Sequence, residues 1–332
     1  MKVKNFQKYG GLHCESTATG SLLKQLGIEL SEAMVVGLGE GLNFIFWKMS
    51  ILSLPFIGGR SKQFALTTKL CENLGLELDV RETASKGKAW TNLKDNLDHG
   101  LPVGLQLDCY HLEYFSVPFH FPGHFVTAYD YDDEYIYLLD TGEFQKTSIR
   151  SLELARFEKG SMSAKARSWT ISPPKELPEI KSMIPKAIHS VANQFINPPI
   201  SALGYKGIKK MSEEIVHWIE QADNPSQDIY DIADLMENGG TGGALFRNLF
   251  RDFLNECQAY YPNVDSLNLA LNIYKEVAPM WTEVSNLLKQ ASETLDVKFL
   301  TEASLLCQKI STMEYEAMIL LANADWGHNS LV

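Results

Sequence analysis

Residues 123–140 read GHFVTAYDYDDEYIYLLD. Two runs with alternating apolar residues flank an acidic pair, which is the pattern of two antiparallel strands joined by a turn. His124 opens the first strand and Asp140 closes the second. Because successive side chains of a strand point to opposite faces, His124 shares a face with Val126, and Asp140 shares one with Leu138. If both apolar sets cover the same core, His124 and Asp140 stand on one face of the hairpin.

The register of this hairpin decides whether the two side chains meet. Direct opposition of His124 and Asp140 requires an even register sum, and hence an odd-length loop or a bulge. In that register their Cβ atoms would lie about 5 Å apart. The carboxylate could then accept the proton of one ring nitrogen, fix the tautomer and stabilise the imidazolium. Taken singly, His124 could be a core histidine and Asp140 a turn residue.

A nucleophile for such a pair lies upstream. Cys14 follows a glycine pair and directly precedes residues 15–26, ESTATGSLLKQL, which have the pattern of a helix stopped by Gly27. Free amides and the helix dipole at a helix N-terminus favour the thiolate, which is the nucleophile that acyl transfer needs. A free cysteine on its own is more commonly a small buried hydrophobe. The chain order of Cys14, His124 and Asp140 nevertheless predicts a cysteine-hydrolase site.

Acyl transfer also needs donors for the oxyanion. The candidates are the backbone amide of Cys14, the side-chain amide of Gln7 and, as a weaker alternative, His13. Tyr114 stands in the long loop before His124, and we expect it to line the substrate channel. These residues complete the predicted catalytic and substrate-binding set in the sheet-forming part of the chain.

The glycine run Gly37, Gly39 and Gly41 resembles a dinucleotide-binding loop, but no strand precedes it and the third glycine has the wrong spacing. We therefore expect Gly39 and Gly41 to let backbone pass close to the substrate. A tight structural turn is the alternative.

Other motifs have simpler interpretations. His120 and His124 have metal-like spacing, but the Phe-Pro-Gly between them excludes a helix, so no metal site is predicted. Cys109 is expected to end a strand. Arg247 and Arg251 follow a glycine-rich segment and could hold a phosphate at a helix start. A solvated charged face is the alternative for these two arginines.

The bulk composition is that of a globular protein, with 332 residues, 45% apolar and 21% charged. This length suggests about two domains. The net charge of -11 argues against nucleic-acid binding, which needs a basic face. The five cysteines are odd in number and lack C-x-x-C spacing, so a reducing cytoplasm is expected.

Neither a signal peptide nor a membrane span is predicted. Residues 1–10 carry three lysines and no apolar run. The longest apolar stretch, 42–57, contains Asn43, Lys48 and Pro55, and it is shorter than the roughly 20 residues of a spanning helix. We interpret it as buried core.

Prolines concentrate in residues 172–185, where they predict a linker. Before the linker, helical patterns precede strand-like runs, which is an α+β arrangement. After it, apolar residues recur at helical spacing. The predicted domains are therefore 1–175, a catalytic domain, and 176–332, an all-α domain. The expected helices are 15–26, 31–36, 63–74, 208–221, 227–237, 243–260, 266–288 and 298–321, and the expected strands are 76–81, 103–107, 125–129, 135–139 and 166–171.

The chain resembles the butirosin biosynthesis BtrH family. The resemblance rests on GLHCESTATGSLLKQLGIELSEAMVVGLGEGLNFIFW from residue 11, on the hairpin segment 123–140, and on GGALFRNLFRDFLNEC at 242–257, which is similar to the helical domain of unknown function that commonly follows. It spans nearly the whole chain. Its most specific stretch is His13-Cys14 followed by GLGEGL at 37–42.

This resemblance implies a papain-like fold related to bacteriocin-leader peptidases. It implies that an acyl group passes from the phosphopantetheine thioester of an acyl or peptidyl carrier protein to an amine, an aminoglycoside or a diamine, in antibiotic biosynthesis. Nonribosomal peptide pathways are among those that use such enzymes. Cys14 would be the nucleophile, His124 the base and Asp140 the orienting residue. Papain-like enzymes usually place the oxyanion glutamine about six residues before the cysteine, whereas Gln7 lies seven before it.

No bound cofactor or metal is expected, because a thioester is already activated. A peptidase or thioesterase on the same three residues is the first rival function, and a non-catalytic binding module is the second. A homodimer is one option that the sequence leaves open. The acyl group and the amine are not specified by the sequence.

Overall fold

The computed structural model describes residues 2–60, 62–174, 176 and 179–327, and the chain forms two compact units. The first consists of Met1–Val35 and Leu66–Pro178, and the second of Val36–Ala65 and Glu179–Val332. The chain therefore passes from one unit to the other three times. The predicted domains, 1–175 and 176–332, differ from these units in one respect: residues 36–65 pack with the C-terminal helices.

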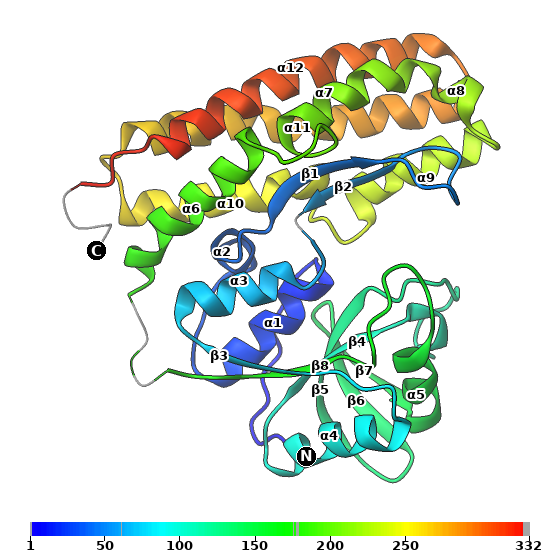
Figure 1. Cartoon of the computed structure of the whole chain (residues 1–332), viewed down its shortest axis with the longest axis vertical. Coiled ribbons are helices and arrows are strands. Elements are labelled where there is room, and N and C mark those ends of the chain that lie inside the picture. Colours follow the sequence, from blue (N-terminus) through cyan, green and yellow to red (C-terminus); the bar gives the residue numbers. More distant parts are fainter. Residues whose placement is uncertain (1, 61, 175, 177–178, 328–332) are drawn as a thin grey trace. The chain divides into compact units, whose positions relative to one another are not determined.

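The first unit contains a six-stranded antiparallel sheet (Figure 1). Its spatial order is β3-β8-β4-β5-β6-β7. The five strands predicted in this region are all present, and a polar edge strand, β7, adds to them. The strands are β3 (Glu77–Arg81), β4 (Val103–Leu107), β5 (His124–Tyr131), β6 (Tyr135–Asp140), β7 (Glu143–Ser148) and β8 (Ser168–Ser172).

Helix α1 packs on the middle of this sheet, where Thr127 Oγ1 on β5 donates to the carbonyl of Ala18 at 3.1 Å. In Figure 1, α1 and α3 lie above the sheet and α4 lies below it. The apolar residues of α1, such as Leu22 and Leu23, are fully buried. The helical elements whose residues lie wholly or mostly in this unit are α1 (Cys14–Gln25), α3 (Ala65–Leu74), α4 (Lys86–Asp98), η1 (Cys109–His111) and α5 (Ile149–Phe157), while α2 (Glu32–Leu38) spans the boundary.

The β5–β6 hairpin has the even register and the bulge that the sequence argument required. Thr127 pairs with Leu139 and Ala128 pairs with Leu138, and the register shifts at a bulge between Ala128 and Asp130. If this register is continued to the end of β6, residue 140 falls opposite residue 126. His124 and Asp140 thus share a face, and they are diagonal neighbours and not directly opposed.

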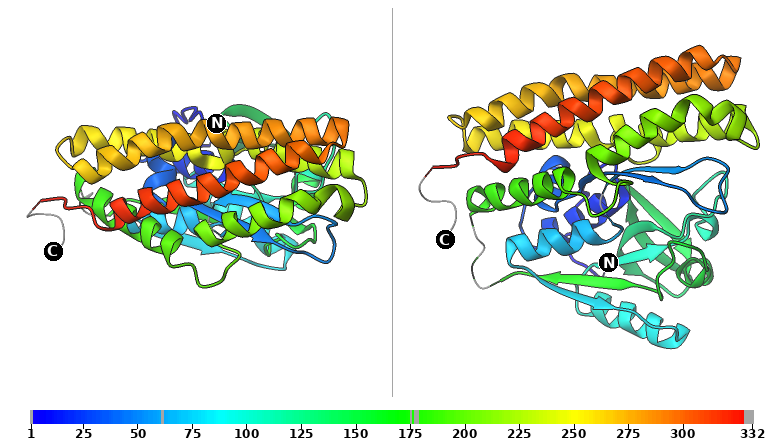
Figure 2. Two further views of the ribbon diagram at one scale, coloured as in Figure 1. Left: turned by 90° about the horizontal axis from the view of Figure 1, so that it is seen from above. Right: turned by 45° about the horizontal axis from the view of Figure 1, so that its top comes forward.

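The second unit is mainly helical. Two long helices, α11 and α12, run side by side in Figure 2, joined by a short turn at Leu295. All five helical segments predicted here are present, and two of them, 208–221 and 243–260, are divided into shorter helical elements. The helical elements are α6 (Ile180–Ile196), α7 (Gly204–Glu214), η2 (Ile215–His217), α8 (Trp218–Gln221), α9 (Pro225–Asn238), η3 (Ala244–Phe246), α10 (Arg247–Tyr260), α11 (Asp265–Thr294) and α12 (Val297–Ala322).

A β-hairpin of β1 (Leu42–Trp47) and β2 (Phe56–Arg60) also belongs to the second unit. Phe46 N donates to the carbonyl of Ala202, and Ile45 bridges Leu203. The expectation that 42–57 is buried core therefore holds for the strand β1 but not for the connecting turn, where Ile51 is 75% exposed.

A buried ion pair links this hairpin to the helices. The guanidinium of Arg247 binds the carboxylate of Glu314 through two hydrogen bonds of 2.8 and 2.9 Å, and both side chains are fully buried. Arg247 also donates to the carbonyl of Asn43 on β1, and Trp281 Nε1 donates to Glu314. Arg247 is therefore a structural residue, neither a phosphate ligand nor part of a solvated face.

The proline-rich region was expected to be a linker up to residue 185, but α6 begins at Ile180. Pro185 lies inside this helix and is buried. The apolar contacts of the helix therefore outweigh the loss of one backbone donor. Among the described residues, no helix has both the length and the apolar character to cross a membrane.

Candidate active site

His124 and Asp140 form a buried hydrogen-bonded pair in the first unit. Nε2 of His124 lies 2.9 Å from Oδ1 and 2.8 Å from Oδ2 of Asp140. The two residues are only 7% and 3% exposed. The strand ends predicted to present these side chains therefore bring them together, although the pairing is diagonal. A histidine ring is long enough to span a diagonal separation on a sheet.

The surroundings favour the charged form of both groups. Burial alone would lower the pKa of His124, but the charge of Asp140 and its hydrogen bond raise this pKa well above 6.5. Burial alone would raise the pKa of Asp140, yet His124, Tyr114 and Thr141 together hold it below its ordinary 3.8. The pair consequently behaves as an imidazolium and a carboxylate.

Cys14 is the first residue of α1, as the sequence predicted. Its side chain is 8% exposed and lies beside the ring of His124, whose pKa it helps to raise. Since Nε2 of His124 faces Asp140, Nδ1 is the ring nitrogen left for a thiol. The structure thus places Cys14, at a helix N-terminus, next to the hydrogen-bonded pair of His124 and Asp140.

Glu32 holds the loop that leads into α1. Its Oε1 accepts from the amides of Leu12 and His13 at 2.9 and 2.8 Å and from the hydroxyl of Ser16 at 2.7 Å. A side chain at Gly11 would clash with Thr17 Oγ1 and would lie 3.0 Å from Glu32 Oε1, which explains the glycine. Sequence reasoning missed Glu32, because a contact across twenty residues has no local signal.

A second thiol lies at the same imidazole. Cys109 stands in η1, just beyond β4, is 1% exposed, and its side chain lies beside His124. Burial raises the pKa of Cys109, and the contact with His124 only partly offsets this. Cys109 was expected to be an ordinary strand end. Strand pairing explains its position: Cys109 follows β4, and Leu107 at the end of β4 pairs with His124.

Aromatic side chains from the loop before β5 surround the imidazole. The Phe115 ring meets His124 edge-on at 5.9 Å between centroids, and Phe121 lies at 6.5 Å. Tyr114 packs against Phe115 and donates its hydroxyl to Asp140 Oδ2 at 2.8 Å. Tyr114 was predicted to line a substrate channel, and this role stays a prediction; its hydroxyl binds the carboxylate of the pair.

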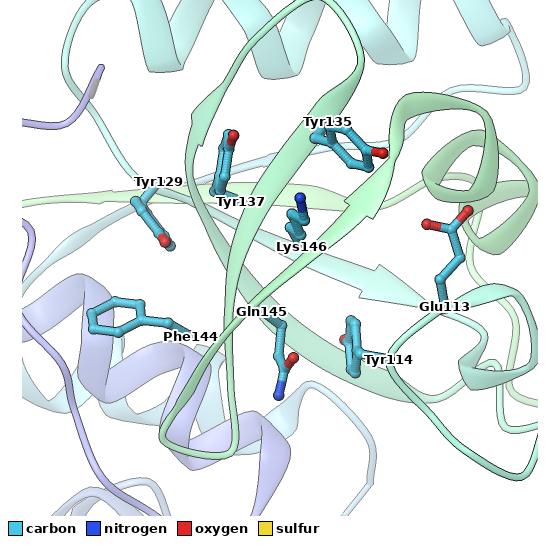
Figure 3. A pocket seen from close by; sticks show the side chains of 8 residues that line it. All are labelled: Glu113, Tyr114, Tyr129, Tyr135, Tyr137, Phe144, Gln145 and Lys146. Atoms are coloured by element: carbon cyan, nitrogen blue, oxygen red, sulfur yellow. The ribbon is translucent and has the colours of Figure 1, made fainter.

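The ring of Tyr114 also lines a pocket of about 490 Å³ (Figure 3). Lys146 lies in this pocket with Nζ 4.2 Å from the centroid of the Tyr135 ring. The walls are mostly aromatic. The lining residues are Glu113, Tyr114, Tyr129, Tyr135, Tyr137, Phe144, Gln145 and Lys146.

The remaining predicted site residues lie elsewhere. Gln7 is exposed, whereas the His124 pair is buried. His13 caps α1, where its Nδ1 accepts from the amide of Ser16 at 3.3 Å. Gly39 and Gly41 belong to the second unit, in a buried turn between α2 and β1. Their assigned role in substrate binding stays a prediction.

A second histidine–aspartate contact lies in the same unit. His120 Nδ1 is 3.3 Å from Oδ2 of the buried Asp108, and its ring stacks on Tyr110. No group of three or more His, Cys, Asp or Glu residues within the described part of the chain has the arrangement of a metal site. All five cysteines are free thiols.

Two family models match this chain and together span most of it. Residues 13–141 match Butirosin biosynthesis protein H, N-terminal, and residues 150–321 match Domain of unknown function (DUF4872). No curated protein matches the chain. A sheet-containing N-terminal part followed in the sequence by a helical region matches the two-domain architecture of this family. The chain belongs to the BtrH family.

Proposed function

We propose that this protein is a cysteine-dependent acyltransferase that moves an acyl group from a carrier-protein thioester to an amine. The observation that carries the proposal is the position of Cys14, at the start of α1, beside the hydrogen-bonded pair of His124 and Asp140. Membership of the BtrH family adds support, because it implies a biosynthetic, acyltransferase-like role. The reaction would form an amide bond in antibiotic biosynthesis.

In the first step the thiolate of Cys14 attacks the thioester carbonyl. The thiol proton resides on Nδ1 of His124, and Asp140 stabilises the imidazolium through Nε2. A carbon–sulfur bond to Cys14 forms while the bond to the phosphopantetheine sulfur breaks. The departing thiolate takes the proton from His124, so atoms and charge balance. The backbone amide of Cys14, at the helix N-terminus, is the donor we assign to the oxyanion.

In the second step the amine attacks the acyl-Cys14 carbonyl. His124, neutral after the first step, takes a proton from the attacking nitrogen, and that proton then passes to the departing Cys14 sulfur. The product is an amide and the enzyme returns to its starting state. Because a thioester is activated, neither a metal nor ATP is required. The phosphopantetheine belongs to the substrate and is not a resident cofactor.

The scaffold we assign is papain-like. Three features support it: a nucleophile at the first turn of a buried helix, a histidine at the start of one strand, and an aspartate at the end of the adjacent strand. The antiparallel sheet that carries the last two packs on the helix. Gln7 would hold the oxyanion in a papain-like enzyme, but its exposure gives this assignment no support.

The partners follow from the reaction class. An acyl or peptidyl carrier protein would deliver the acyl group, and a small amine, an aminoglycoside or a diamine, would accept it. The net charge of -11 suits a polycationic acceptor. The same acidic surplus repels an acidic carrier, so we expect carrier docking at a local basic patch. The cytoplasm remains our expected location.

Hydrolysis on the same residues is the competing function. The burial of Cys14, His124 and Asp140 favours aminolysis, since water must be kept from the acyl-enzyme for an amide to form. The test is incubation with an acyl-carrier thioester and a panel of amines, followed by mass spectrometry of the products. Amide that depends on Cys14 supports the transferase. Free acid as the sole product would identify a thioesterase. Unchanged thioester would support a non-catalytic binding module.

A further inference from the structure

The carboxylate of Asp140 has a donor besides His124, and it comes from a loop. The hydroxyl of Tyr114 lies 2.8 Å from Oδ2, the same oxygen that His124 Nε2 approaches at 2.8 Å. Asp140 is 3% exposed, so water contributes little to holding its carboxylate. The plane of the carboxylate is therefore fixed by neighbouring side chains, and Tyr114 is one of them.

The backbone of Tyr114 is itself anchored. Its neighbour Glu113 accepts from the amide and hydroxyl of Ser148, each at 2.9 Å, and from the hydroxyl of Ser151 at 2.8 Å. These three donors lie at the N-terminus of α5, where Ser148 is the cap. The loop that carries Tyr114 is thus tied to a helix of the same unit. A tyrosine held in this way can position a carboxylate and does not merely fill space beside it.

We propose that Tyr114 is a positioning residue for the reaction of Cys14, and that its hydroxyl orients the Asp140 carboxylate towards His124. This proposal rests on the proposed function, and it gives the hydroxyl of Tyr114 a role besides the expected one in substrate binding. The hydroxyl shares the negative charge of Asp140 and limits rotation of the carboxylate. The Asp140 carboxylate therefore stays within hydrogen-bond distance of His124 Nε2 throughout the reaction, and Nδ1 stays directed at the thiol.

Two properties of the site support this role. The ring of Tyr114 lines the pocket and packs on Phe115, so Tyr114→Phe keeps the packing and deletes only the donor. The donor also helps to hold the pKa of Asp140 below its ordinary value. Its loss should raise that pKa, because burial then has less opposition.

The experiment compares Tyr114→Phe with Tyr131→Phe in the full-length protein. Tyr131 donates to Asp98 Oδ1 at 2.8 Å, so the control deletes a tyrosine–aspartate hydrogen bond of equal length at an exposed carboxylate. The probe is an acyl-carrier thioester with an amine acceptor, and the readouts are kcat, KM and the pH profile of kcat. For Tyr114→Phe we expect kcat to fall about tenfold or more with little change in KM.

The pH profile separates positioning from a general structural role. The acid limb of Tyr114→Phe should move to higher pH, since Asp140 would take up its proton more readily, while Tyr131→Phe should follow the wild type. A Tyr114→Phe variant with wild-type kcat and an unmoved acid limb would overturn the proposal. If Cys14→Ala also keeps full activity, the proposed function itself has failed. If Cys14→Ala is inactive, only the role of Tyr114 is wrong.

Discussion

Asp140 reaches His124 along a diagonal of the β5–β6 hairpin, and both of its oxygens lie within 2.9 Å of the same ring nitrogen. The bulge between Ala128 and Asp130 sets this register. Because Nε2 of His124 faces Asp140, the second ring nitrogen is left for the thiol of Cys14. The arrangement depends on charge as well as shape, because both members of the pair are buried.

Asp140→Asn should lower acyl transfer by about 10² to 10⁴-fold. The amide keeps the shape of the carboxylate but no longer stabilises the imidazolium. Burial then dominates, and the pKa of His124 should fall from its raised value. Steady-state kinetics measure the rate, and an NMR titration of the histidine ring protons measures the pKa. A raised histidine pKa that persists in Asp140→Asn would contradict the ion pair.

The same pair makes stability depend on pH. The raised pKa of His124 stabilises the fold fully below 6.5, and this contribution is lost as the pH rises through the folded value. The lowered pKa of Asp140 stabilises the fold above 3.8, and this contribution is lost as the pH falls through the folded value. The difference in unfolding free energy between wild type and Asp140→Asn should therefore be largest between 3.8 and 6.5. Urea unfolding at several pH values measures it, and a flat difference would refute the prediction.

Cys14, not Cys109, should be the reactive thiol. Both side chains lie beside His124, but Cys109 is 1% exposed and burial raises its pKa. Burial also raises the pKa of Cys71 and of Cys307 to about 12. Iodoacetamide should therefore add one equivalent to the native protein at residue 14.

Peptide mass spectrometry locates that label. Cys109→Ser is the matched control and should keep both the label and the larger part of the activity. Cys14→Ala should lose the label and at least about 10³-fold in rate. Labelling of Cys109 in the native protein would contradict the assignment of Cys14 as the nucleophile.

Glu32→Ala should slow the reaction by about 10 to 100-fold, because the loop that precedes Cys14 loses its anchor and a displacement of about 1 Å has this effect. Glu32→Gln keeps an oxygen for the amides of Leu12 and His13, so its loss should be smaller. Glu72→Ala, which removes a partner of the exposed Lys69, is the control. Equal rates for all three variants would show that Glu32 does not position the nucleophile.

Glu314→Gln should destabilise the second unit by about 3–5 kcal/mol, since it leaves the charge of Arg247 buried without a partner. Replacing both residues, as Arg247→Met with Glu314→Leu, should recover a large part of that loss. Glu153→Gln removes one side of the exposed pair with Lys86 and should cost less than about 1 kcal/mol. Chemical denaturation measures all three, and a Glu314→Gln variant as stable as the control would contradict the structural role.

Local sequence patterns predicted the parts of the site that depend on local structure, namely the hairpin and the start of the first helix. Alternation of apolar residues predicted the hairpin and put His124 and Asp140 on one face, and the position of Cys14 before a helical pattern predicted its place at the start of α1. The alternation left open whether the two residues are directly opposed, and the register set by the bulge makes them diagonal neighbours.

Long-range contacts were missed for the same physical reason. Tyr114 and Cys109 reach His124 or Asp140 from a loop and a short 3-10 helix whose paths no local pattern encodes. The edge strand β7 is too polar to be recognised as a strand. The apolar run 42–47 suggested a buried segment, but its partners, residues 202, 203 and 247, lie more than 150 positions away.

The β1–β2 hairpin lies within the segment that matches the N-terminal family model, yet it pairs with backbone and side chains of the helical unit. Recombination between the two family segments at a single crossover would separate these strands from the helices they belong to. A chimera with a foreign C-terminal half would have to re-create the buried counterion of Arg247 and the backbone partner of Phe46. Because residues 36–65 belong to the helical unit, we expect the two family segments to be inherited together.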